Sequence, residues 1–220
     1  MPTTSRPWQT QYAPGVPGDI EVTDESLSDL LDSAVRRFPE HVALDFYGAT
    51  TTYRDLGDQV ARAAQALADQ GVRRGDRVAL VIPNCPQHVV AFYAALRLGA
   101  VVVEHNPLYT AEELHHQFAD HGATVAIAWD KVVPTLQQVG LDTELRTVIA
   151  VDLTTALPPK QRWMLRLPVA KARRTREAMT APAPGALRLP QRGQHAEFEV
   201  GKRHVAARGG PARRHRRAAD

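Results

Sequence analysis

Several residue types are scarce in this sequence, and each shortage excludes a class of protein. Of its 220 residues only Cys85 is a cysteine, which excludes a disulfide framework and any multi-cysteine zinc or iron–sulfur site. Aromatic residues make up 6% of the chain, so we expect a core mainly of valine, alanine and leucine. The stretch most like a membrane span, 89–103, contains Arg97 and is shorter than the ~20 residues that a span needs. With no apolar run of the secretion type at its N-terminus, the sequence predicts a cytoplasmic protein.

Glycine is also scarce, with 14 in the chain, and the glycine-rich loops that hold phosphates are missing. No GxGxxG follows a predicted strand, and no GxxxxGK[ST] occurs anywhere. The only double glycine is Gly209-Gly210, in a basic segment near the end of the sequence. The sequence therefore gives no support for a dinucleotide site or a triphosphate-binding loop.

Charge is distributed unevenly along the chain. Residues 1–159 hold 11 Lys or Arg and 20 Asp or Glu, a net charge of −9. Residues 160–220 hold 16 Lys or Arg and 4 Asp or Glu, a net charge of +12. Such a split is typical of a basic tail that binds nucleic acid or a membrane, although other origins produce it too.

Apolar periodicity predicts helices and strands that alternate. We expect Thr23 or Asp24 to cap the first helix, and Thr52 with Asp55 to open the second, which ends at Gly71. Predicted strands are apolar on both faces, which indicates a mostly parallel sheet flanked by helices, an α/β fold. The predicted helices are 27–38, a second that carries its apolar face from Leu56 to Leu67 and stops at Gly71, 86–98 (apolar nearly all round and so deeply buried), 111–121 and 132–139. The predicted strands are 42–47, 50–53, 77–82, 100–103, 125–128 and 147–151.

Four segments follow from these patterns. Residues 1–22, rich in proline, read as an extended arm without a regular element. Residues 23–155 form the α/β lobe, and regularity fades after Leu153. Residues 156–187 are a basic amphipathic segment. Residues 188–220, dominated by Arg, Ala, Gly, Pro and His, are predicted to be a disordered basic tail because they carry too few apolar side chains to offset the entropy of ordering.

Histidines and the cysteine are the residues with the most evident chemistry. His116 and His121 are five residues apart, so they do not share a helix face as i,i+4 ligands would, and neither His115 nor any cysteine completes a metal site. We interpret these histidines as a solvated helix face. Cys85 precedes a predicted helix, where a thiol pKa is lowered, yet no base accompanies it; we expect a buried spectator. No catalytic, cofactor-binding or metal-binding residue can be assigned.

Two stretches resemble a known family. The sequence Thr51-Thr52-Tyr53-Arg54-Asp55-Leu56, followed by the alanine-rich helix 60–67, is similar to the first core motif of AMP-forming adenylating enzymes. The second core motif of these enzymes is similar to residues 96–103 of this chain. The similarity continues through Asn106-Pro107-Leu108-Tyr109-Thr110 and Glu112-Glu113-Leu114. The intervening 71–79 and Pro83-Asn84 also fit, and the arm 7–20 resembles the start of bacterial long-chain fatty-acid–CoA ligases. The resemblance covers about residues 6–187.

The resemblance implies the first part of a much longer protein, an incomplete N-terminal lobe of the adenylate-forming fold. Such enzymes join a fatty acid to ATP, release pyrophosphate and transfer the acyl group from AMP to coenzyme A, with Mg²⁺ neutralising the triphosphate. The family's Ser/Thr/Gly-rich loop, acidic ribose-binding residue and C-terminal lysine have no counterpart in this sequence. Of the matched residues, Tyr53, Leu56, Gly99, Ala100 and Pro107 fit packing rather than catalysis. We therefore expect no ATP, Mg²⁺ or CoA site and no catalysis by this chain alone.

The resemblance stops after Leu187, where the composition becomes that of GC-rich DNA read out of frame. We therefore interpret the chain as a truncated or frameshifted ligase product. One alternative is a non-catalytic binding or scaffold protein with an adenylating-lobe fold that forms a homodimer. A genuine tail, in which 213–217 would attract nucleic acid phosphates, is a further and less favoured alternative.

The basic segment has two interpretations. Residues 160–179 interleave Trp163, Met164 and other apolar side chains with lysine and arginine, a pattern that suits peripheral contact with an anionic membrane. The alternative, which we favour from the sequence, is a solvated linker whose helix is interrupted at Pro168.

Overall fold

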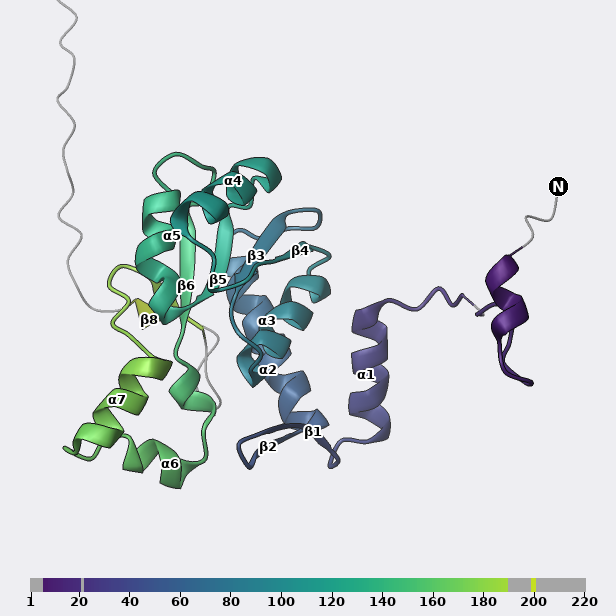
Figure 1. Cartoon of the computed structure of the whole chain (residues 1–220), viewed down its shortest axis with the longest axis horizontal. Coiled ribbons are helices and arrows are strands. Elements are labelled where there is room, and N and C mark those ends of the chain that lie inside the picture. Colours follow the sequence, from purple (N-terminus) through teal and green to yellow (C-terminus); the bar gives the residue numbers. More distant parts are fainter. Residues whose placement is uncertain (1–5, 21, 190–198, 201–220) are drawn as a thin grey trace, which may run out of the picture.

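A six-stranded sheet forms the centre of the molecule. The computed structural model describes residues 6–20, 22–189 and 199–200. The sheet has the strand order β4-β3-β5-β6-β7-β8, in which β4 to β7 are parallel and β8 pairs antiparallel with β7 (Figure 1). This arrangement confirms the predicted mostly parallel α/β fold. The strands are β3 Arg77–Val81, β4 Val101–Glu104, β5 Val125–Trp129, β6 Thr147–Val151, β7 Leu187–Arg188 and β8 Glu199–Val200.

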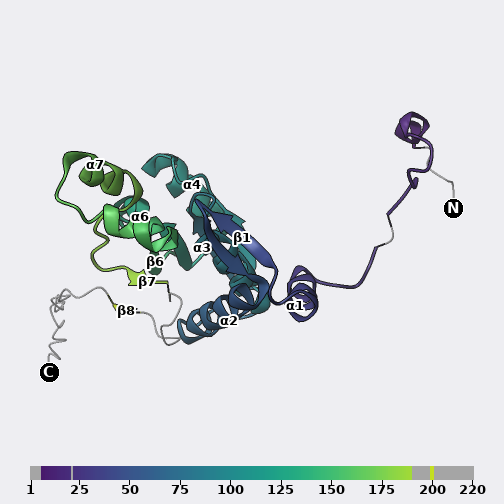
Figure 2. The same ribbon diagram turned by 90° about the horizontal axis from the view of Figure 1, so that it is seen from below.

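Helices cover both faces of this sheet, as Figure 2 shows for α2 and α4. Because side chains alternate along a strand, Val78 and Leu80 of β3 enter a core with α2 and α3, whereas Ala79 and Val81 enter a second core with α4 and α5. Leu31 joins α1 to the first core. The helices of these layers are α1 Leu27–Arg37, α2 Tyr53–Asp69, α3 Pro86–Arg97, α4 Ala111–His121 and α5 Val133–Val139, the last preceded by a 3₁₀ turn, η2 Asp130–Val132.

Helix starts follow their capping residues. The Thr52 hydroxyl accepts a hydrogen bond from the Asp55 amide at 3.1 Å, as predicted. The predicted start of α1 at Thr23 or Asp24 is wrong. Ser26 caps that helix, because Ser26 and Asp29 each bond the other's backbone amide and so satisfy two free donors at once.

Strands β1 Val42–Phe46, β2 Ala49–Thr52 and β4 depart from the predicted pattern of parallel strands buried on both faces. Strands β1 and β2 pair antiparallel in a separate hairpin, with Tyr47 and Gly48 at φ 53° and 85° in its two-residue turn. Strand β4 begins one residue later than the predicted 100–103. It is not buried on both faces, because it ends the sheet and pairs with β3 alone among the described strands.

Two further expectations are corrected. The predicted extended arm contains a 3₁₀ helix, η1 Pro7–Gln11, whose first residue is a proline with φ already suited to a helical turn. Regular structure also continues past Leu153, because Leu153, Leu157 and Ala172 are buried and anchor it. The elements there are η3 Leu153–Ala156, α6 Pro159–Met164, α7 Ala170–Met179 and strand β7.

The predicted disordered tail, 188–220, overlaps the described residues at few positions. Arg188 lies in β7 and Leu189 is buried, so the sheet extends beyond the predicted boundary. Positions 199–200 form β8. The remaining positions, 190–198 and 201–220, lie outside the described residues.

Candidate functional site

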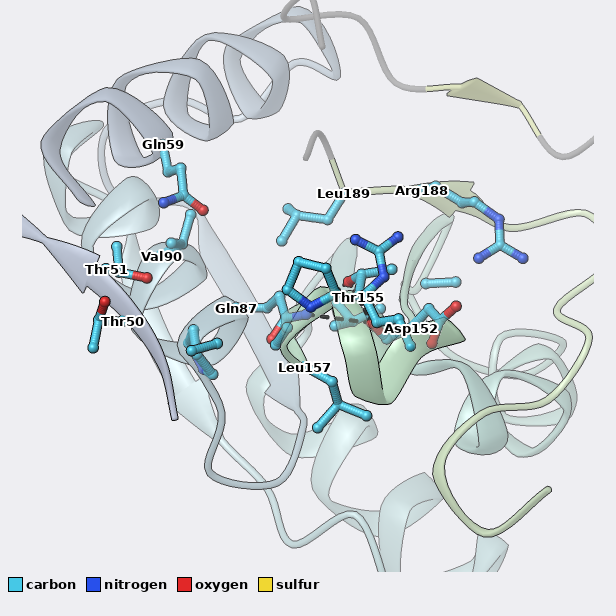
Figure 3. A pocket seen from close by; sticks show the side chains of 17 residues that line it. Thr50, Thr51, Gln59, Gln87, Val90, Asp152, Thr155, Leu157, Arg188 and Leu189 are labelled. Carbon is cyan, nitrogen blue, oxygen red and sulfur yellow. Dashed lines mark hydrogen bonds between the residues drawn. The ribbon is translucent and has the colours of Figure 1, made fainter. Parts of the chain in front are cut away.

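A cavity of about 290 Å³ lies where several chain segments meet beyond the carboxyl ends of β6 and β7. Its walls come from the β2 strand, the starts of α3 and α6, the segment that follows β6, and the end of β7; Figure 3 shows the labelled side chains around it. Ligands of open α/β sheets bind outside the carboxyl ends of strands. This cavity is therefore the candidate site.

Gln87 connects two of these walls. Pro86 begins α3 directly after the β3 turn, which places Gln87 in the first helical turn. Its side-chain amide donates to Thr155 Oγ1 at 2.9 Å and to the Asp152 carbonyl at 3.3 Å. The other end of the side chain, Gln87 Oε1, is buried without a hydrogen-bond partner in the described part of the chain. This wall thus holds a free acceptor.

Two carboxylates directly follow adjacent strands. Asp152 directly follows β6, and its Oδ1 accepts from the Thr154 amide at 2.8 Å and the Thr154 hydroxyl at 2.6 Å. Asp130 directly follows β5, is fully buried, and accepts a hydrogen bond from the Thr180 hydroxyl. Burial raises the pKa of Asp130 to about 6, and the nearby Asp152 charge adds to that rise. Ionisation of Asp130 therefore lowers the stability of the folded chain. This loss of stability grows as the pH rises from 3.8 through about 6.

Two arginines supply positive charge at the cavity. Arg162 of α6 and Arg188 of β7 are both half-buried and line it. Neither forms an ion pair with any described residue. The Arg188 charge acts on the buried Asp130 and lowers its pKa, against the larger effect of burial. The cavity thus combines cations, hydroxyls and amide groups suited to a small polar ligand.

Magnesium and a nucleoside triphosphate do not fit these residues. Mg²⁺ needs an octahedron of oxygen ligands, and among the described residues that line the cavity Asp152 is the one carboxylate. Among the described residues no group of three or more His, Cys, Asp or Glu could hold a metal. The cavity volume is at the lower end of the ~300–1,000 Å³ typical of ligand pockets.

The histidines and the cysteine lie away from the cavity. His115 and His116 are exposed on α4, as expected of a solvated face, whereas His121 packs with Phe118 and His105. Cys85 is buried, and burial raises its thiol pKa to about 11. Its position before α3 therefore does not produce a thiolate at neutral pH.

Hydrogen bonds fix the protons of the pair formed by buried His105 and half-buried His121. His105 Nδ1 lies 2.6 Å from the Gln117 side-chain oxygen and so carries a proton. His121 Nδ1 accepts from the Ala123 amide at 3.0 Å, which leaves the His121 proton on Nε2. Each metal ligand must be an unprotonated nitrogen, so the pair does not present two ligands to one metal.

Sequence reasoning missed Gln87, Asp130, Asp152 and His105. Asp130 and Asp152 had a usable signal, because each is the first polar residue after a strand that is apolar on both faces. Gln87 and His105 had none, since their partners are distant in the sequence or on another element. In the described part of the chain, no helix is long and apolar enough to cross a membrane.

Comparisons of this chain with protein families and with curated proteins point to the same family. The family described as AMP-binding enzyme matches residues 31–186. A long-chain-fatty-acid–CoA ligase of Bacillus subtilis is 36% identical over 131 residues, covering 60% of this chain and 23% of the relative. A ligase with the same description from Yersinia pestis is 37% identical over 145 residues, covering 64% and 26%.

Solved structures agree with this family. A crystal structure of a long-chain-fatty-acid–CoA ligase from Archaeoglobus fulgidus matches with a TM-score of 0.58 and 26% identity, covering 64% of this chain and 30% of that one. A putative ligase of the same kind from Rhodopseudomonas palustris matches with a TM-score of 0.55. The chain thus spans about a quarter of the length of the curated relatives cited. It belongs to the AMP-binding enzyme family and has the fold of part of the N-terminal lobe of adenylate-forming enzymes.

Proposed function

We propose that this chain corresponds to the N-terminal part of a long-chain fatty-acid–CoA ligase. In the whole protein the reaction is fatty acid plus ATP and coenzyme A giving acyl-CoA, AMP and pyrophosphate. The observation that supports the proposal is the 36–37% identity to ligases of this description over about a quarter of their length. By itself the chain forms no acyl-adenylate, since its cavity residues do not fit MgATP.

Pyrophosphate release tests this proposal. The purified chain with ATP, Mg²⁺ and palmitate is expected to release pyrophosphate at the rate of a no-enzyme control. The reason is that an attacking carboxylate needs a triphosphate that is positioned and charge-neutralised. The full-length Bacillus subtilis ligase serves as the positive control. Turnover above background by the 220-residue chain would overturn the proposed inactivity.

The composition after Leu187 supports a further part of this proposal, a change of reading frame. The family match ends at residue 186, and the following residues are dominated by Arg, Ala, Gly, Pro and His. Sequencing of the locus is expected to show the rest of a ligase in another frame downstream. Absence of such a remnant would contradict the frameshift.

A second candidate, a binding or scaffold protein that dimerises, is supported by one edge of the sheet. Strand β4 ends the sheet without a partner on its outer side among the described residues, and Val101 on it is 51% exposed. Such an edge is a template for pairing with another chain.

Substitution at this edge tests the scaffold candidate. Val101→Lys is expected to shift any concentration-dependent dimer of the chain toward monomer in size-exclusion chromatography with light scattering, because a charged edge residue disfavours strand pairing. Leu108→Lys, at an exposed position after β4, is the matched control and should leave the distribution unchanged. A monomer at all concentrations in the unsubstituted chain would rule this candidate out.

A further inference from the structure

The α6–α7 face, defined here as residues 159–179, concentrates positive charge. It holds seven Lys or Arg and one Glu, and six of the seven cations are exposed. None of these cations forms an ion pair with a described residue. Their charge is therefore not neutralised within the described fold.

Apolar side chains are exposed on the same face. Trp163 is 64% exposed, Met164 55% and Val169 51%. Beside them lies an apolar groove of about 440 Å³, lined mainly by α6, α7 and the bend between them, with Lys171 at its wall. Figure 1 shows α6 and α7 together at one end of the molecule, away from α1. A solvated linker would not need this amount of exposed apolar surface.

We propose that the α6–α7 face docks on a bilayer that contains anionic phospholipid. Trp163, Met164 and Val169 enter the boundary between headgroups and acyl chains, and the surrounding cations contact lipid phosphates. Charge complementarity selects an anionic partner. Exposed tryptophan and methionine next to an apolar groove favour lipid over an acidic protein surface, because an indole ring prefers the membrane interface. The inference does not rest on the proposed ligase function.

Co-sedimentation with vesicles measures the electrostatic contribution to membrane binding. We expect the chain to pellet with vesicles of phosphatidylcholine mixed with phosphatidylglycerol and not with phosphatidylcholine alone. Replacing Arg173 and Arg174 by glutamine should lower the partition coefficient by about twenty-five-fold, since each cation near an anionic surface contributes about fivefold. Arg36→Gln with Arg37→Gln on α1 is the matched control and should change it little.

Basic residues outside the described part could also bind anionic vesicles, so a local probe is needed. Vesicles with brominated acyl chains quench tryptophan that enters the bilayer. We expect them to quench the unsubstituted chain, and expect most of that quenching to disappear in Trp163→Phe while sedimentation is nearly retained. Trp8→Phe is the control and should keep the quenching.

Three outcomes would overturn the proposal. The first is equal binding to neutral and anionic vesicles, and the second is no binding to either, which would leave an acidic protein as the partner to test. The third is quenching that is unchanged in Trp163→Phe, which would place the contact elsewhere in the chain.

Discussion

Phe118→Ala is expected to lower the free energy of unfolding by about 3–5 kcal/mol, a large share of the ~5–15 kcal/mol typical of a folded domain. Phe118 is the largest of the fully buried side chains and lies in the core between the sheet and helices α4 and α5. The rings of His105 and His121 pack against it with centroids 5.1 Å and 4.8 Å away. Removal of this ring leaves a cavity that the rigid sheet cannot close.

Urea unfolding followed by circular dichroism measures this loss. The matched control is Phe38→Ala at the end of α1, where the ring is 41% exposed and a much smaller loss is expected. A loss below about 1 kcal/mol for Phe118→Ala would contradict the placement of Phe118 at the centre of this core. Should the variant fail to fold at all, Phe118→Leu, which removes less volume, gives a smaller loss in the same direction.

The second large effect is a loss of stability in acid that depends on His121. Burial lowers the pKa of His121 to about 4 from its ordinary 6.5, and the neighbouring His105 adds to this shift. Burial also lowers the pKa of His105, although its hydrogen bond to Gln117 opposes that effect. Because unfolding lets His121 bind a proton more tightly, its contribution to stability is complete above pH 6.5 and is lost as the pH falls through about 4.

A pKa shift of this size corresponds to about 3 kcal/mol, and partial exposure of the ring reduces the expected effect to about 2 kcal/mol. His121→Asn should remove this part of the pH dependence, because asparagine can still accept the bond from the Ala123 amide but does not titrate. His116→Asn, on the exposed side of α4, should leave the pH dependence intact. Unfolding curves between pH 4 and pH 7 give the comparison.

The outcome that contradicts this account is an identical slope for His121→Asn and the unsubstituted chain. Charges around the pair act in both directions: Asp120 and Glu104 favour protonation, whereas Arg77 opposes it. Asp130 titrates in an overlapping range with the opposite sign, since its raised pKa favours the folded state at low pH. The comparison of His121→Asn with the unsubstituted chain cancels the Asp130 contribution, because both chains contain it.

Local signals predicted much of the fold. Thr52 marks the start of α2, and Gly71, Gly99 and Gly122 mark helix ends, where each adopts the positive φ that glycine tolerates best. The uninterrupted apolar run of β3 indicated a strand buried on both faces, as observed. These features depend on residues within one or two turns of each other, so the sequence pattern contains them.

Non-local features were not predictable from pattern. Strand β4 is apolar in sequence like β3, yet it lies at the edge of the sheet, a position set by strand order rather than composition. The bond from Gln87 to Thr155 joins residues 68 positions apart, and that from Thr180 to Asp130 joins residues 50 apart. No local periodicity reports such pairs, so the candidate cavity could be found only in the folded chain.

The central claim is that this chain has the architecture of an adenylating lobe without a site for a triphosphate. Calorimetric titration of MgATP into the folded 220-residue chain tests it most directly, with the full-length Bacillus subtilis ligase titrated in parallel. The account predicts no saturable heat for the chain. Saturable one-to-one binding, reduced by Arg162→Gln or Arg188→Gln at the cavity, would contradict it.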